Sequence, residues 1–271
     1  MGAAEELDPS ESVLFYYATE FRAARRLHGV SQREMARQAY ISPSLLNKVE
    51  SGRRLPTEDL SQLADHVFGT GDRFHRLWHL VMRYAYPTWF QPYVDLEGAA
   101  TVIRSFQTVL LPGLFQTERY ARAVLAPGRP DSNELDNSVT ARLERQGVLA
   151  KKNAPEFRCV LDESAIRRPW GGKEVMREQL ERVIEFAQTP HFVVQVIPFE
   201  GGGRPGGDTS FSTLSLDEGP DVVYVDGFLA GQVLAEPEHV AVAYRTHELL
   251  MAEALSPARS LDFIASALRA L

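Results

Sequence analysis

The chain of 271 residues has little cysteine, no long apolar run and no excess of positive charge. Cys159 is its single cysteine, so the chain can form neither an internal disulfide nor a zinc site built on several cysteines. No stretch approaches the roughly 18 consecutive apolar residues that a membrane span requires. The acidic N-terminus lacks the basic-then-apolar order of a secretory signal. These absences predict a soluble cytoplasmic protein with no membrane partner.

The overall charge excludes one class of protein and leaves another open. A formal net charge of -7 argues against a chain coated in cationic surface. Hydrophobic residues make up 44% of the chain, which is too many for an intrinsically disordered protein and enough for one large core or two modest ones. The distribution of charge along the chain therefore matters more than its sum.

Residues 1–86 read as an all-α domain of five helices, and two of these helices carry the strongest local signals. Ser31 and Glu34 form the S-x-x-E pattern of a capping box at the start of one helix. Only two residues separate the end of that helix from Ser42, which is placed to cap a further helix that opens with Pro43 and stops at Gly52. The spacing predicts a tight helix-turn-helix.

Residues 87–271 read as a second domain of α+β class with a small, mostly antiparallel sheet. A helix containing Ile103 and Phe106 is expected from Leu96 onward, because the two apolar residues recur at helical spacing. Short runs rich in β-branched residues and bounded by Gly, Pro and Asp predict strands. These runs are FRCVLDE, HFVVQVIPFE, TSFSTLSLD, PDVVYVDG and LAGQVLAE.

Basic residues gather in the helix-turn-helix region. Between Phe21 and Pro56 there are eight Lys and Arg residues against Glu34 and Glu50, a local charge of +6 that leaves -13 for the rest of the chain. Such a concentration is what attraction to DNA phosphates requires, although a solvated helical surface would look the same.

The string SQREMARQAYISPSLLNKVESGRRLP resembles the helix-turn-helix of phage-repressor and Cro-like, or XRE-type, regulators. The matching positions are Ser31, Gln32, Ala36, Ile41, Ser42, Leu46, Val49, Glu50, Gly52 and Pro56. The resemblance implies a sequence-specific DNA-binding transcription regulator. Tyr40 is a departure, because the family usually has glycine at this turn, where φ is positive. Either the turn bends differently here or the tyrosine is strained.

In this kind of motif the second of the two helices enters the major groove with its N-terminus first. Its outward residues should meet base edges, with Asn47 suited to adenine and Lys48 to guanine. Gln32, Arg53 and Arg54 are better placed for phosphates, which position the protein without reading sequence. The predicted DNA-contacting residues are Gln32, Ser42, Pro43, Ser44, Asn47, Lys48, Arg53 and Arg54.

A single module of this kind covers only about 600 to 1,000 Å² on DNA, which is small for a selective regulator. Two copies on half-sites about one helical turn apart would enlarge the contact. We therefore expect a homodimer on double-stranded DNA and a pseudo-palindromic operator.

Five segments of the second domain carry a further resemblance, namely WFQPYVDLE, IRSFQTVLLPGLFQTERYARAVL, FRCVLDESAIRRPWGG, QVIPFE and FSTLSL. They are similar to the large C-terminal domain of WhiJ-like regulators of actinomycetes. The resemblance implies a domain that receives a signal, either a small molecule or a small partner protein in an antitoxin-like arrangement.

The patterns of catalytic sites are weak or missing, so we expect no enzyme, metal or cofactor. Gly201, Gly203 and Gly206 fit G-x-G-x-x-G, but Pro205 lies inside the pattern and a strand follows it, not the helix that a phosphate cradle needs. His75 and His79 are one helical turn apart without the glutamate of an H-E-x-x-H site. The alternative is a small-molecule-binding protein or enzyme whose N-terminal helices serve assembly only.

Overall fold

The computed structural model describes residues 7–128, 130–201, 209–227 and 229–271. The chain forms two compact units, which are described separately. The helical unit comprises Met1–Pro87 together with Pro130–Ala141, and the sheet unit comprises Thr88–Arg129 together with Arg142–Leu271.

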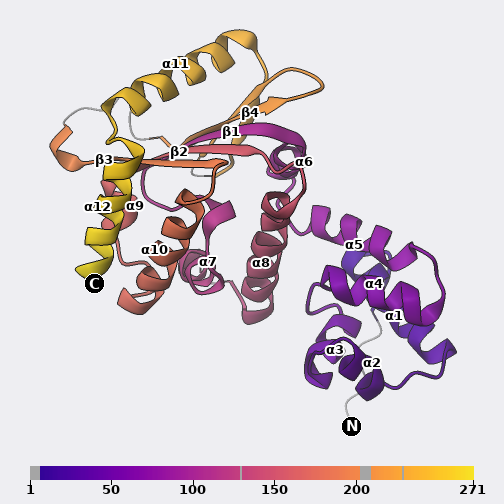
Figure 1. Ribbon diagram of the computed structural model, residues 1–271. Helices are drawn as coiled ribbons and strands as arrows, with labels where there is room; N and C mark the ends of the chain where they lie inside the picture. Colours follow the sequence, from indigo (N-terminus) through magenta and orange to yellow (C-terminus); the bar gives the residue numbers. More distant parts are fainter. Residues whose placement is uncertain (1–6, 129, 202–208, 228) are drawn as a thin grey trace. The chain divides into compact units, whose positions relative to one another are not determined.

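Five helices make up the N-terminal part of the helical unit, as predicted (Figure 1). The first of them begins at Val13. Ser12 is its N-cap, since the Ser12 Oγ accepts a hydrogen bond from the Phe15 backbone N–H at 3.1 Å. The helices are α1 (Val13–Leu27), α2 (Gln32–Gln38), α3 (Pro43–Glu50), α4 (Glu58–Phe68) and α5 (Arg73–Tyr84).

Aromatic rings from three of these helices fill the centre of the helical unit. Phe21 packs edge-on against Phe68 and Phe74, with ring centroids 5.7 Å apart in both pairs. Tyr17 is also fully buried, and its hydroxyl lies 2.8 Å from Ser61 Oγ, so the one polar atom of this side chain is satisfied. These contacts hold α1 against α4 and α5.

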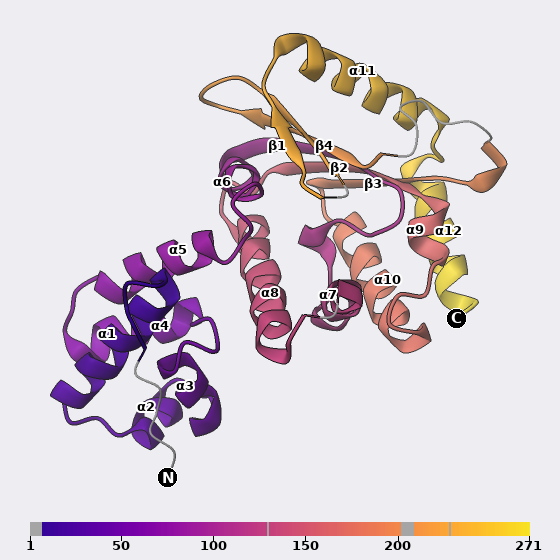
Figure 2. The same ribbon diagram turned by 180° about the vertical axis from the view of Figure 1, so that it is seen from behind.

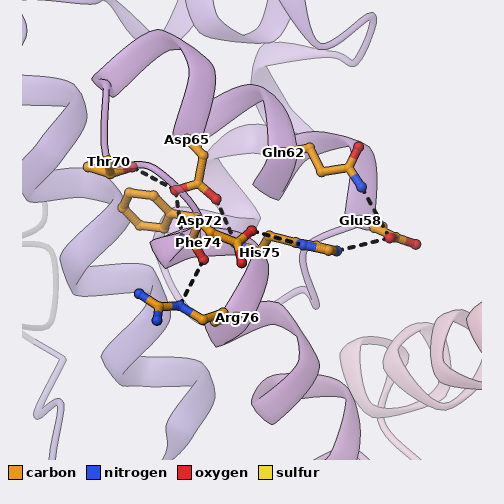
Figure 3. A network of polar contacts seen from close by, with 8 residues as sticks. All are labelled: Glu58, Gln62, Asp65, Thr70, Asp72, Phe74, His75 and Arg76. Carbon is orange, nitrogen blue, oxygen red and sulfur yellow. Dashed lines mark hydrogen bonds and ion pairs between the residues drawn. The ribbon is translucent and has the colours of Figure 1, made fainter.

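A buried carboxylate on α4 caps α5, as Figure 3 shows. Asp72 directly precedes α5 but makes no side-chain bond to its first backbone N–H groups. Asp65 caps the helix in its place, because its carboxylate accepts hydrogen bonds from the backbone N–H of Phe74 and of His75, both at 2.9 Å. Thr70 Oγ1 donates a third bond to the same carboxylate at 2.6 Å. A tertiary contact thus replaces the local cap.

The His75 ring continues this network toward the start of α4. Its Nε2 lies 3.0 Å from Glu58 Oε1 and its Nδ1 lies 3.2 Å from Asp72 Oδ1 (Figure 3). Burial alone would lower the pKa of His75, but the hydrogen bonds with the two carboxylates outweigh it and raise that pKa. His75 therefore acts as a link between carboxylates.

The sheet unit contains a mixed six-stranded sheet among the described residues. Its strands are β1 (Ala100–Gln107), β2 (Glu156–Asp162), β3 (Phe192–Ile197), β4 (Phe211–Leu216), β5 (Val222–Val225) and β6 (Gln232–Leu234). The remaining α-helices of the described chain are α6 (Gln91–Ala99), α7 (Glu118–Leu125), α8 (Ser132–Arg145), α9 (Glu163–Arg167), α10 (Lys173–Ala187), α11 (Pro237–Glu253) and α12 (Pro257–Arg269).

The prediction of a small, mostly antiparallel sheet is wrong. The strand order is β3-β2-β1-β4-β5-β6, and β1 pairs with β2, and β2 with β3, in parallel. Helical segments connect β1 to β2 and β2 to β3, and such crossovers return the chain in the same direction. Only β4, β5 and β6, which follow one another without an intervening helix, extend the sheet antiparallel.

The helix expected from Leu96 through Phe106 is also wrong beyond Ala99, where β1 begins. Ile103 and Phe106 are three residues apart, which suits one helix face but places them on opposite faces of a strand. Ile103 belongs to one core cluster and Phe106 to another, so both faces of β1 are buried. A strand covered on both faces loses the alternating pattern that would have revealed it.

Helices cover both faces of the sheet, as Figures 1 and 2 show from opposite sides. α10 and α12 pack on one face over a core that includes Leu161, Val194 and Ile264. α11 lies across the other face over Val160, Ile197 and Val223. None of the helices in the described ranges is both long and apolar enough to cross a membrane.

His247 on α11 is 1% exposed in the core beneath that helix. Burial, together with the charges of Arg104 and Arg158, lowers the pKa of His247 to about 4. A histidine that is buried in its neutral form binds fewer protons than in the unfolded chain, where its pKa is about 6.5. The folded state is therefore penalised at acid pH and not at neutral pH.

We predict that the sheet unit loses stability, on the order of 3 kcal/mol, as the pH falls from about 6.5 to about 4, because protonation of His247 favours the unfolded chain. His247→Gln should flatten this part of the pH profile measured by urea denaturation. His239→Gln, the same change at an exposed position of α11, is the control and should leave the profile as it is. A profile that His247→Gln leaves unaltered would contradict the assignment.

Candidate nucleic-acid interface

The predicted caps of α2 and α3 are present. Ser31 Oγ accepts a hydrogen bond from the Glu34 backbone N–H, and Ser42 Oγ accepts one from the Leu45 N–H, both at 3.1 Å. Pro43 is the first residue of α3, where its missing N–H costs nothing. Local hydrogen bonds therefore start both helices where the sequence pattern places them.

The predicted capping box at α2 is only half formed. The Glu34 carboxylate accepts hydrogen bonds from Arg37 Nη2 at 2.6 Å and Gln38 Nε2 at 2.8 Å, both further along the helix. These bonds, that of Arg37 first, lower the pKa of Glu34 to about 2. The Arg37 charge is thereby paired on the surface of α2.

The turn between α2 and α3 forms with a tyrosine in the left-handed conformation. Tyr40 has φ 54, and it is the one non-glycine residue with positive φ in the described part of the chain. Of the two alternatives that the sequence left open, the structure shows the second: the turn is retained and Tyr40 is strained.

α3 has one face that is buried in the helical unit and one that is exposed to solvent. Leu46, Val49 and Glu50 are at most 2% exposed and face the core of the helical unit. The residues that start the helix or lie on its other face are exposed to solvent, namely Ser42, Pro43, Ser44, Asn47 and Lys48. Five of the predicted DNA-contacting residues thus share one exposed surface, which we call the α3 face.

An ion pair buried beneath α3 fixes its position. Both oxygens of the Glu50 carboxylate accept hydrogen bonds from Arg25 on α1, one from Nε and the other from Nη2 at 2.9 Å. Gln32 Nε2 on α2 donates to the same carboxylate at 2.7 Å, and Arg25 Nη1 donates to the Val30 carbonyl at 2.8 Å. Arg25 is 7% exposed and Glu50 is 2% exposed. One carboxylate therefore joins three helices.

This ion pair changes the role expected of two residues. Arg25 is counted in the local excess of cations, but its charge is paired with Glu50 inside the helical unit and does not face DNA. Gln32, predicted as a phosphate contact, is half-buried and uses part of its amide to hold Glu50. The sequence does contain a signal for Arg25, since Tyr17, Phe21 and Arg25 recur every four residues on the buried side of α1.

The two arginines that follow α3 differ in their surroundings. Arg53 is exposed. The Arg54 side chain is half-buried, and its Nη1 lies 3.6 Å from Asp136 Oδ2 in the 130–141 segment of the helical unit. The adjacent Asn137 Oδ1 accepts a hydrogen bond from the Leu55 N–H at 2.9 Å. A phosphate would have to replace Asp136 to reach Arg54 fully.

Two family models match the chain. Residues 17–77 match a helix-turn-helix domain, and this range runs from within α1 to the first turn of α5. Residues 90–266, about two thirds of the chain, match a domain of unknown function, DUF5753. The chain belongs to the DUF5753 family. No curated protein and no solved structure matches it.

The helix-turn-helix match confirms the coarser prediction, that the N-terminal domain carries a DNA-binding motif of the kind found in regulators. The DUF5753 match spans the segment that resembles WhiJ-like regulators without itself stating a function. Its LPGLFQTERYA segment contributes to the core, since Leu114, Phe115 and Tyr120 are at most 2% exposed.

Arg167 and Cys159 of the sheet unit are held in packed or paired surroundings. Arg167 Nε lies 3.0 Å from Glu163 Oε1, and its guanidinium lies over the Phe263 ring. Cys159 is buried, and burial raises the pKa of its thiol, which opposes formation of a nucleophilic thiolate. Most of the glycine-rich segment, residues 202–208, lies outside the described residues.

We predict that Glu50→Gln lowers the free energy of unfolding of the helical unit by about 3 kcal/mol, because it leaves the Arg25 charge buried without a carboxylate. Urea denaturation followed by circular dichroism measures the loss. Combining Arg25→Met with Glu50→Leu should recover much of it, since no buried charge then remains.

Glu34→Gln is the matched control, because it removes a carboxylate from the exposed Arg37 pair and should leave the unfolding midpoint nearly unchanged. Equal effects of the two single substitutions would show that the buried pair has no special role.

Proposed function

We propose that this protein is a sequence-specific transcription regulator that reads the major groove with the α3 face. The observation that carries the proposal is the exposure of Ser44, Asn47 and Lys48 on a capped helix whose other side is anchored in the core. A helix held in this way loses little freedom on binding, which favours selective contact. The helix-turn-helix match supports the same role.

The proposed contacts follow from the chemistry of these side chains. Asn47 offers both a donor and an acceptor to the edge of adenine, and Lys48 donates to the acceptors of guanine. Ser42, Pro43 and Ser44 lie where the helix enters the groove. The two serines add contacts of low selectivity, since a hydroxyl pairs with several groups.

Phosphate contacts would come from the residues around the α3 face. Arg53 is exposed just beyond its end, and Gln32 has donor capacity left after its bond to Glu50. Arg54 remains a predicted contact in which the phosphate takes the place of Asp136. These residues supply affinity and position without reading sequence.

For the rest of the chain we propose a homodimer of the XRE class on a pseudo-palindromic site in the cytoplasm. The DUF5753 domain would receive a small ligand or a small partner protein in the antitoxin-like arrangement of WhiJ-like regulators. The small area that one module covers on DNA supports the dimer, and the resemblance of the second domain supports its receiving role.

No catalytic role is proposed. The alternative, a ligand-binding protein or enzyme assembled through its N-terminal helices, predicts no selective DNA complex.

We predict that Arg53→Ala reduces the slope of log affinity against log salt by about one, because each phosphate contact releases about one counterion. A titration of labelled duplex at several salt concentrations measures the slope. Arg259→Ala, at an exposed position of α12, is the matched control and should not change it. An Arg53→Ala slope equal to that of the unaltered protein would remove Arg53 from the interface.

We predict that two copies of the chain occupy one DNA site. Sedimentation at micromolar concentration should show a dimer, or a complex of two chains with one duplex. A monomer alone, with and without DNA, would contradict the dimer while leaving DNA binding itself open to the salt titration.

A further inference from the structure

Three successive helices in the helical unit end in the same hydrogen-bonded motif. After α1, the Gly29 N–H bonds to the Arg26 carbonyl and the Val30 N–H to the Arg25 carbonyl. After α3, Gly52 and Arg53 repeat this pattern. In both motifs a glycine takes the left-handed conformation that the pattern requires, with φ 67 and φ 65.

The end of α2 has this motif with a tyrosine in the place of glycine. The Tyr40 N–H bonds to the Arg37 carbonyl at 3.3 Å and the Ile41 N–H to the Ala36 carbonyl at 3.0 Å. A left-handed residue is required by these two bonds. A side chain with a Cβ is disfavoured in this conformation, and a bulky one especially so.

The Tyr40 ring adds almost no packing in the free protein that could offset this strain. Tyr40 is 97% exposed, so its ring buries almost no apolar surface. The strained, solvated aromatic ring stands two residues before Ser42, the cap of α3. Strain that is retained without a folded-state benefit points to a function.

We propose that Tyr40 contacts the DNA backbone beside the α3 face, with its hydroxyl donating a hydrogen bond to a phosphate and its ring lying against the sugar. This inference rests on the proposed function and adds a residue that the resemblance does not supply, since the family usually has glycine at this position.

The dimensions of helix and groove favour the backbone over the bases. The major groove is about 12 Å wide, and an α-helix with its side chains fills about 10 to 12 Å of it. Tyr40 precedes the helix and its cap, so it lies beyond the end that enters the groove. At that place it faces the sugar-phosphate wall and not the groove floor.

A neutral phenol and a cationic side chain differ in one measurable respect. An arginine or lysine on a phosphate releases a counterion and adds to the salt dependence of binding. A tyrosine hydroxyl adds affinity without adding to that dependence. The expected signature of Tyr40 is therefore weaker binding at every salt concentration with the slope preserved.

The test uses the full chain and labelled duplexes that the unaltered protein selects from a random-sequence library. Tyr40→Gly should weaken binding about tenfold, and Tyr40→Phe about threefold because the ring remains, with the salt slope unchanged in both. Tyr40→Gly should also raise the thermal unfolding midpoint of the helical unit by about 2 °C, because glycine relieves the left-handed strain. A gain in stability with a loss of affinity is the combination that a merely structural residue does not give.

Tyr84→Phe is the matched control for the hydroxyl, since Tyr84 is 61% exposed on α5, and its affinity should equal that of the unaltered protein. Binding by Tyr40→Gly and Tyr40→Phe within twofold of the unaltered protein would overturn the inference while leaving the proposed function standing. A lower unfolding midpoint for Tyr40→Gly would also overturn it, because the ring would then stabilise the free protein. If the unaltered protein selects no duplex, the proposed function fails and the inference fails with it.

Discussion

The buried pair of Arg25 and Glu50 is the interaction on which the helical unit depends. Placing two charges away from water costs several kcal/mol per ion, and only close geometry with additional hydrogen bonds offsets it. Here both carboxylate oxygens accept from Arg25, Gln32 adds a further donor, and Val30 accepts from the guanidinium. Apolar contacts alone would allow α3 to slide or rotate, whereas these directional bonds give it one orientation.

Two kinds of constraint therefore meet at α3. On the inward face of the helix, Leu46 and Val49 pack in the core and Glu50 is held by the ion pair. At its two ends, Ser42 caps the first turn and the left-handed Gly52 closes the last. The side chains of Ser44, Asn47 and Lys48 are exposed on the other side and are available for a partner. A rigid element with a chemically unoccupied face is suited to recognition.

Local signals predicted the helical unit well because its helices start and stop through bonds between near neighbours. Ser31, Ser42 and Gly52 act within a few residues of their own positions, and the positive φ at Tyr40 follows from the same turn. The capping of α5 by Asp65 and the partners of Arg25 and Arg54 could not be predicted in this way. These contacts join residues distant in sequence, and a charged side chain is by default expected to face water.

The sheet unit shows where periodicity misleads. β1 is covered on both faces, so Ile103 and Phe106 read as one side of a helix when they are two sides of a strand. α10 lies between β2 and β3, and a helix between two strands allows them to pair in parallel. Local patterns predicted that this unit contains strands as well as helices, but they did not predict how the strands pair.

The most direct measurement compares the affinity of Asn47→Ala and of Gln62→Ala for a selected duplex and for a scrambled duplex of equal length. Both substitutions shorten an exposed amide side chain of the helical unit, one on the α3 face and one on α4. Recognition through α3 predicts that Asn47→Ala loses about tenfold of the preference for the selected duplex, while Gln62→Ala retains the preference in full. Full preference retained by Asn47→Ala, and by a matching Lys48→Ala, would contradict the central claim that α3 reads the DNA.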